Sequence, residues 1–197
     1  RYAVSGYKFY AWLRENLLKY SVHTAEEAHK TGIPMMRPLP MVFPEDKEAV
    51  YWEDEYFYGS DLLVAPVHQE GEKRRIYFPS GSWINLLDFR KMVGGNRIFQ
   101  VDVPIDKIPV YIREGACILS VMNGELQLGQ SMTYEKKNTV LMSRALNETS
   151  GKRYADGKKL NTIFWAKRVK ISLCFAMHLR QNLLFFLVLT ESQKVWS

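Results

Sequence analysis

Apolar residues recur every three or four positions at the start of the chain, and this spacing predicts one long helix over residues 6–31. The residues of its predicted buried face are Phe9, Leu13, Leu17, Tyr20 and Ala28. Gly32 suits the position just after the last turn, and Pro34 prevents the helix from continuing. A helix of about 25 residues is roughly 40 Å long, so it requires a large partner surface.

Residues 33–43 form a short apolar stretch with little alternation, which predicts a strand buried on both faces, as in a parallel sheet. The prolines in this stretch restrict it to a short pairing segment. Residues 44–48 then predict a turn that enters a short helix. Because one helix and one strand do not build a parallel sheet, the pattern indicates that this region belongs to a larger α/β structure.

After Gly59 the pattern changes to short strands separated by turns. Strands are predicted at residues 62–67, 74–79, 83–87, 98–103, 108–112 and 116–121, with turns at residues 79–82 and 94–96. Strands of this length and spacing are typical of an antiparallel β-sandwich. Residues 122–160 are polar and poorly patterned, with turns predicted at residues 123–124 and 156–157, whereas residues 163–175 again have strand character.

The net charge of +6 is unevenly distributed. Residues 131–197 hold twelve Lys and Arg against four Asp and Glu, a balance of +8, so the rest of the chain has −2. Such asymmetry is found in nucleic-acid-binding proteins, but no recognition motif or phosphate loop accompanies it. We therefore interpret the charge as that of a solvated β-rich surface and expect no nucleic-acid partner.

Neither the cysteines nor the apolar segments indicate a special class of protein. Cys117 and Cys174 form no zinc or disulfide pattern and are interpreted as buried, inert thiols. We expect no metal and no cofactor. The apolar run at residues 183–189 is far shorter than the ~20 residues that cross a bilayer, so we expect no membrane partner. The lack of a signal peptide slightly favours the cytoplasm, but the chain starts at Arg1 without Met, which leaves localisation undecided.

Six stretches of the chain match, in order, the motifs of one enzyme family. They are residues 14–20 (R-E-N-L-L-K-Y), 27–39 (E-A-H-K-T-G-I-P-M-M-R-P-L), 43–46 (F-P-E-D), 54–67 (D-E-Y-F-Y-G-S-D-L-L-V-A-P-V), 78–83 (F-P-S-G-S-W) and 108–116 (I-P-V-Y-I-R-E-G-A). Together they cover about residues 10–120, and the match fades beyond. In these motifs the chain resembles glycoside hydrolase family 31, a family of retaining α-glucosidases and α-xylosidases.

The resemblance implies a fold and a division into domains. Residues 1–58 are expected to be the end of a catalytic (β/α)8 barrel, with its last helix and strand. Residues 59–121 are expected to be a proximal C-terminal β-sandwich domain. Residues 122–197 are expected to be a partial or divergent distal β-domain with an unmatched tail. The fold class is therefore α/β plus all-β.

The resemblance also implies an activity. The expected reaction is hydrolysis of terminal α-glucosidic or α-xylosidic bonds in an oligosaccharide, and the partner of this chain is the remaining barrel of the same protein. A retaining glycosidase needs two carboxyl groups about 5–5.5 Å apart. In the family these two aspartates lie on earlier barrel strands, and no residue here matches either motif. We therefore assign no catalytic residue and expect the chain alone to be inactive.

Four residues are structural candidates. Arg37 lies in an apolar strand, where a buried charge requires a carboxylate partner, expected near the barrel rim. Trp83 is interpreted as core packing rather than as a platform for sugar rings, as is Trp52. Arg113 and Asp54 lie in matched motifs, and Asp54 belongs to an acidic run, residues 53–55, that we interpret as a solvated or capping cluster.

Two other classes of function remain open from the sequence. One is a free-standing β-sandwich module that binds carbohydrate, against which the long helix and its Arg37-Pro38-Leu39 strand argue. The other is a basic interaction module for an acidic partner, which salt-sensitive retention on heparin or DNA would favour.

Overall fold

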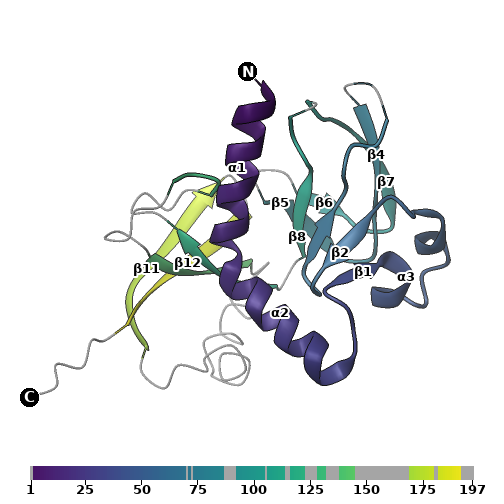
Figure 1. The fold of residues 1–197 in the computed structure, drawn as a ribbon. Coiled ribbons are helices and arrows are strands. Elements are labelled where there is room, and N and C mark those ends of the chain that lie inside the picture. Colours follow the sequence, from purple (N-terminus) through teal and green to yellow (C-terminus); the bar gives the residue numbers. More distant parts are fainter. Residues whose placement is uncertain are drawn as a thin grey trace, which may run out of the picture. The chain divides into compact units, whose positions relative to one another are not determined.

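The computed structural model describes residues 2–69, 71, 73–86, 92–104, 106–113, 116–122, 128–131, 138–144, 169–179 and 182–191 (Figure 1). The chain divides into two compact units. The first unit comprises residues 1–10 and 20–114, and the second unit comprises residues 11–19 and 115–197. The limits predicted for the three domains, at residues 58 and 121, stay predictions.

The predicted long helix is present as two consecutive helices, α1 (Tyr2–Asn16) and α2 (Leu18–Thr31). They are separated at Leu17, whose backbone N–H still donates to the Leu13 carbonyl at 3.1 Å. Gly32 has a φ of 76° and its N–H donates to the Ala28 carbonyl at 2.9 Å. The predicted helix end at Gly32 is therefore confirmed, because this left-handed conformation favours glycine.

The first unit is built on antiparallel strands. Its six-stranded sheet has the order β1 (Met36–Pro38), β2 (Tyr56–Tyr58), β3 (Leu62–Val64), β8 (Val110–Arg113), β5 (Ser82–Asn85) and β6 (Met92–Gly94). A separate pair joins β4 (Lys73–Phe78) to β7 (Arg97–Asp102). The short helices α3 (Leu39–Val42) and η1 (Lys47–Tyr51) lie between β1 and β2 in the chain, and η1 is the short helix predicted to follow the turn at residues 44–48.

The two sheets of the first unit share one hydrophobic core. Phe57, Leu63 and Trp83 contribute from the six-stranded sheet, and Ile76 and Phe78 contribute from β4. All five side chains are fully buried. Packing of one antiparallel sheet on another is the arrangement of a β-sandwich, so the all-β part of the fold prediction is confirmed.

The second unit contains a four-stranded antiparallel sheet in the order β11 (Val169–Leu179), β12 (Asn182–Glu191), β10 (Asn138–Arg144) and β9 (Cys117–Met122). A register shift between Ile171 and Leu173 interrupts the β11–β12 ladder. The sequence pattern missed β10 and β12. The turns predicted at residues 123–124 and 156–157, and the side chains of Cys117 and Cys174, lie outside the described part of the chain.

The prediction of a strand buried on both faces at residues 33–43 is wrong. The strand there, β1, is three residues long, pairs antiparallel with β2 and buries only Arg37, while Met36 and Pro38 are exposed. Helix α3 follows directly after β1. Pro40 is compatible with this helix because it lies in the first turn, where the backbone N–H that proline lacks has no partner within the helix. Every strand pair that the structure describes is antiparallel, so the barrel part of the fold prediction is not seen in it.

No helix within the described ranges is both long and apolar enough to span a membrane.

Candidate functional site

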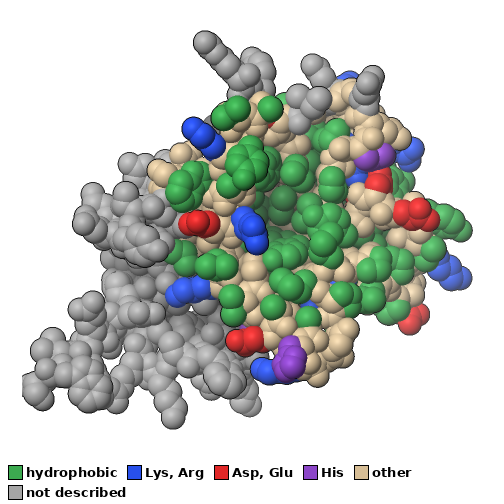
Figure 2. Space-filling view, in the orientation of Figure 1, with side chains coloured by type: hydrophobic (Ala, Val, Ile, Leu, Met, Phe, Trp, Pro, Cys, Tyr) green, Lys and Arg blue, Asp and Glu red, His purple; other side chains and the backbone are tan. Residues whose placement is uncertain are grey.

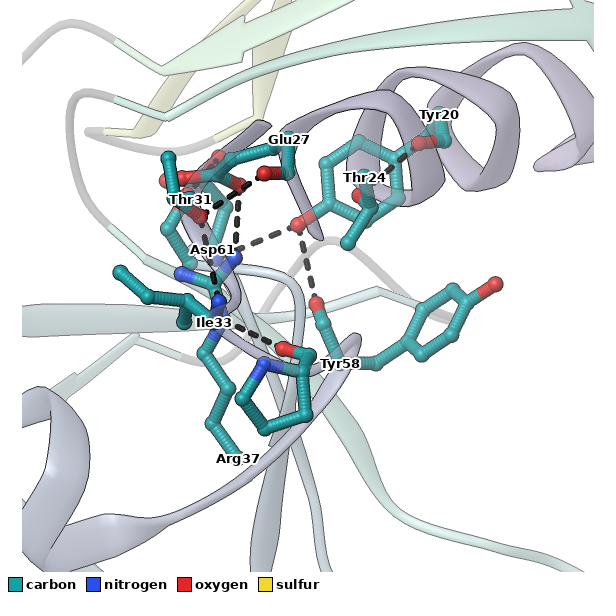
Figure 3. Close-up of polar contacts among 10 residues, drawn as sticks. Tyr20, Thr24, Glu27, Thr31, Ile33, Arg37, Tyr58 and Asp61 are labelled. Atoms are coloured by element: carbon teal, nitrogen blue, oxygen red, sulfur yellow. Dashed lines mark hydrogen bonds and ion pairs between the residues drawn. The ribbon is translucent and has the colours of Figure 1, made fainter. Parts of the chain in front are cut away.

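Arg37 is held between α2 and the segment before β1 (Figure 3). Its Nη2 donates to Glu27 Oε2 at 2.6 Å, and its Nε donates to the Pro34 carbonyl at 2.9 Å. The Arg37 side chain is 7% exposed, whereas that of Glu27 is 36% exposed. The carboxylate partner that a buried arginine requires is thus supplied by α2, and a place near a barrel rim stays a prediction.

Tyr20 joins α2 to the β2–β3 hairpin (Figure 3). Its hydroxyl donates to the Tyr58 carbonyl at 2.9 Å and accepts from the Asp61 backbone N–H at 3.3 Å. Burial raises the pKa of Tyr20 well above its ordinary value, so the hydroxyl keeps its proton. Gly59 passes so close to the ring that a Cβ there would lie 2.8 Å from Tyr20 Cζ. We call Tyr20, Glu27, Arg37, Tyr58 and Asp61 the α2 junction.

A second polar cluster surrounds Arg74 on β4. Arg74 Nη1 donates to Asp54 Oδ2 at 3.1 Å, and Nη2 donates to the Asp54 carbonyl at 3.0 Å. His68 Nδ1 lies 2.9 Å from the same Asp54 oxygen and also contacts Arg74 Nη1. His68 Nδ1 can donate to Asp54 when it carries the proton and can accept from Arg74 when it does not. The tautomer of the ring therefore decides which of the two bonds forms. The structural candidate Asp54 therefore anchors Arg74 and His68.

Glu55 is buried beneath this cluster, with only 2% of its surface exposed. Its Oε1 accepts the Tyr77 backbone N–H at 3.0 Å and lies 3.9 Å from Arg74 Nη2. Burial raises the pKa of Glu55 to about 8, against the opposing effects of the Tyr77 N–H and the Arg74 charge. The interpretation of residues 53–55 as a solvated or capping cluster is wrong for Glu55, because successive residues point in different directions and this one faces the core.

A pocket of about 380 Å³ opens beside this cluster. Its lining residues are Trp52, Asp54, Val67, His68, Gln69, Lys73, Arg74, Arg75 and Gln100. Trp52 stacks on Tyr77, with ring centroids 5.7 Å apart and planes 14° apart, and the Arg75 guanidinium lies 5.8 Å from the Trp52 ring centroid. Trp52 is half-buried, so it contributes to packing as well as to the pocket wall. We call this site the basic pocket.

The other two structural candidates lie outside the basic pocket. Trp83 is fully buried and its Nε1 donates to the Pro79 carbonyl at 3.0 Å, so it is a core residue, in keeping with the interpretation as packing. The Arg113 guanidinium lies 4.8 Å from the Phe43 ring centroid. Arg113 also lines a more open hollow of about 660 Å³, together with Asp46, whose Oδ2 accepts from the Tyr77 hydroxyl at 2.6 Å.

The two carboxyl groups of the cluster around Arg74 have different surroundings. Asp54 is engaged by Arg74 and His68, and Glu55 is buried behind Arg74. No group of His, Cys, Asp and Glu within the described ranges is suited to hold a metal ion. Sequence reasoning did not find the basic pocket, because its parts come from four separate segments of the chain. The one signal in the sequence was the basic run at residues 73–75.

The sequence model of the glycosyl hydrolase family 31 C-terminal domain matches residues 32–118. Among curated proteins, the chain is similar to an isomaltosyltransferase of Sporosarcina globispora, with 34% identity over 127 residues, 64% of this chain and 12% of that protein. It is also similar to alpha-glucosidase 2 of Bacillus thermoamyloliquefaciens, with 32% identity over 112 residues, 56% of this chain and 14% of that protein.

Among solved structures, the chain is similar to the cycloalternan-forming enzyme from Listeria monocytogenes, which was determined with a pentasaccharide substrate. The TM-score is 0.63 and the identity is 26%, over 72% of this chain and 16% of that one. The antiparallel fold and these matches show that the chain resembles part of a glycoside hydrolase. More specifically, residues 32–118 correspond to the C-terminal domain of glycoside hydrolase family 31, and the chain resembles the C-terminal part of that family's α-glucosidases.

Proposed function

We propose that this chain is the C-terminal part of a retaining α-glycosidase that hydrolyses terminal α-glucosidic or α-xylosidic bonds in oligosaccharides. The observation that carries the proposal is the match of residues 32–118 to the C-terminal domain of family 31. The chain spans only 12% and 14% of the two curated relatives named above. The proposal assigns the nucleophile and the acid/base aspartate to the part of the protein that precedes this sequence.

The exposed apolar residues of α1 and α2 support the proposal that these helices pack against a further part of the protein. Leu13 and Tyr20 are buried, whereas Val4 and Tyr7 on α1 and Leu18 and Val22 on α2 are each more than half exposed. Successive residues of a helix are rotated by about 100°. Val4 therefore lies on the opposite side of α1 from Leu13, nine positions away, and Leu18 lies nearly opposite Tyr20 on α2. Figure 2 shows hydrophobic side chains over much of the visible face.

An apolar stripe opposite a buried face is typical of a helix packed on both sides. In the proposal the stripe packs against the preceding barrel, of which α1, α2 and β1 are the last helix and strand. The exposed stripe also predicts marginal solubility of the 197-residue chain alone. A chain that stays monodisperse at every concentration tested would contradict this part of the proposal.

A second candidate is glycosyl transfer, which the isomaltosyltransferase relative favours. Retaining glycosidases pass through a covalent glycosyl-enzyme intermediate that water then hydrolyses. A sugar hydroxyl that attacks the same intermediate gives transfer instead. The ratio of longer oligosaccharides to free glucose, measured at high substrate concentration, separates the two candidates.

The test compares the complete protein with the 197-residue chain on p-nitrophenyl α-D-glucoside and α-D-xyloside. We expect the complete protein to release p-nitrophenol and NMR to detect the α-anomer first, because two displacements retain configuration. We expect the chain alone to show no turnover. Release of the β-anomer by the complete protein, or hydrolysis by the chain alone, would overturn the proposal.

A further inference from the structure

The basic pocket has an excess of positive charge among its described lining residues. Lys73, Arg74 and Arg75 share the lining with one carboxylate, Asp54, which is already bound to Arg74 and to His68. Glu55 does not balance this charge, because burial raises its pKa to about 8 and leaves the carboxyl mostly protonated at neutral pH. A pocket lined by fixed cations attracts anions more strongly than a flat surface with the same charges.

Arg74 is fixed in place and still has hydrogen-bonding capacity. Its side chain is 4% exposed, and Asp54 orients both terminal nitrogens. Its Nε is buried without a hydrogen-bond partner among the residues that the structure describes. Buried arginine donors are normally satisfied, so the unpaired Nε leaves Arg74 with unused hydrogen-bonding capacity. Oxyanions accept from guanidinium donors with favourable geometry.

The exposed part of the pocket wall has matching chemistry. Arg75 is exposed, lies over Trp52 and is the cross-strand partner of Gln100, which lines the same pocket from β7. An amide and a second guanidinium therefore line the same pocket as Arg74. The pocket volume of about 380 Å³ has room for a phosphate ion or for one acidic sugar unit.

We propose that the basic pocket binds an oxyanion, either free phosphate or the carboxylate of an acidic saccharide, through Arg74 and Arg75. This proposal stands on the residues of the pocket and does not depend on the proposed glycosidase activity. Glu70 and Glu72 flank Gly71 in the sequence and lie outside the described residues. Their charges provide a variant whose expected effect has the opposite sign.

The experiment titrates the 197-residue chain with sodium phosphate at constant ionic strength, so that general screening does not change. The NMR signals of the Trp52 indole N–H and the His68 ring report binding at the pocket. We expect saturable shifts of both signals. Arg75→Gln is expected to weaken binding at least about fivefold, as loss of one charge-assisted contact of roughly 1 kcal/mol requires. The matched control Arg97→Gln, an exposed arginine on β7 outside the pocket, is expected to change the Kd less than about twofold.

Three further titrations complete the test. Glu70→Gln/Glu72→Gln removes two negative charges and is expected to strengthen binding, and weaker binding would contradict the proposal. Glucuronate that binds more tightly than phosphate identifies the saccharide carboxylate as the source, and the reverse order identifies free phosphate. The proposal is overturned if neither anion shifts the two signals, if Arg75→Gln and Arg97→Gln weaken binding equally, or if uncharged glucose binds as tightly as glucuronate.

Discussion

The α2 junction and the basic pocket are two polar clusters of the same unit, and they satisfy their polar groups differently. In the α2 junction, the buried Tyr20 hydroxyl and the Arg37 guanidinium both have protein partners. In the basic pocket and just beneath it, Arg74 Nε and Glu55 Oε2 are buried without hydrogen-bond partners among the described residues. Satisfied polar networks fix one structure, whereas unsatisfied buried groups mark places where something else binds or titrates.

The difference suggests that the two clusters have different roles within the first unit. The α2 junction holds α2 against the β2–β3 hairpin, and changes there should lower stability without affecting any ligand. The basic pocket is a recognition surface supported by Asp54, and changes at its rim should affect anion binding without affecting stability. Four substitutions test this division, and each has a stability measurement as its readout.

The largest effect is expected for Gly59→Ala, a substitution beside Tyr20 of the α2 junction. Gly59 has a φ of 66°, and the new Cβ would overlap the Tyr20 hydroxyl and lie 2.8 Å from Cζ. We expect a loss of about 3 kcal/mol in the free energy of unfolding, measured by urea denaturation. Gly32→Ala is the matched control, because Gly32 has a φ of 76° but no atom within 4 Å of the methyl group that alanine would add. It should lose only about 1 kcal/mol, and equal losses would contradict the role of the close approach.

Glu55→Gln tests the buried carboxyl beneath the basic pocket. The folded-state pKa of Glu55 is raised from 4.5 to about 8, so its contribution to stability is fully present below pH 4.5 and is lost as pH rises through about 8. Glutamine stays neutral, so the free energy of unfolding of the variant, relative to that of the native chain, should rise by about 2 kcal/mol from about pH 6 to pH 8. Urea denaturation at these two pH values measures the gain. Parallel pH profiles of the two proteins would show that Glu55 is charged in the folded state.

Tyr20→Phe removes the hydroxyl that the α2 junction shares between two backbone groups. The Tyr58 carbonyl and the Asp61 N–H would each lose this bond. We expect a loss of about 1–2 kcal/mol in the free energy of unfolding. Tyr7→Phe is the control, because Tyr7 is 77% exposed. If both variants unfold at the same urea concentration, the hydroxyl of Tyr20 does not stabilise the junction.

The smallest effect on stability is expected for Arg75→Gln, the substitution that should weaken anion binding most clearly. Arg75 is exposed and its described contact is the Trp52 ring. The free energy of unfolding should therefore change by less than about 0.5 kcal/mol in buffer without phosphate. A larger loss would show that Arg75 supports the fold, and the contrast between the two clusters would disappear.

Local signals in the sequence predicted much of this fold. Gly32 and Pro34 identified the end of α2, and the turn predicted at residues 79–82 identified the start of β5, because both features depend on neighbours in the chain. Residues 33–43 misled in part, since Arg37 was expected to be buried but its apolar neighbours Met36 and Pro38 are exposed. The pairing of Asp54 with Arg74 joins residues 20 positions apart, and the periodicity of apolar residues does not predict such pairs. The burial of Glu55 was missed for the same reason, because the β4 backbone sets it.

The most direct test of the central claim is the coding sequence upstream of Arg1, read in all frames. The account predicts that the open reading frame extends upstream of residue 1. The extension should encode a (β/α)8 barrel with two aspartates on its strands, in a protein several times longer than this chain. A start codon immediately before Arg1, in frame and used in the cell, would contradict the assignment of this chain to a complete α-glycosidase.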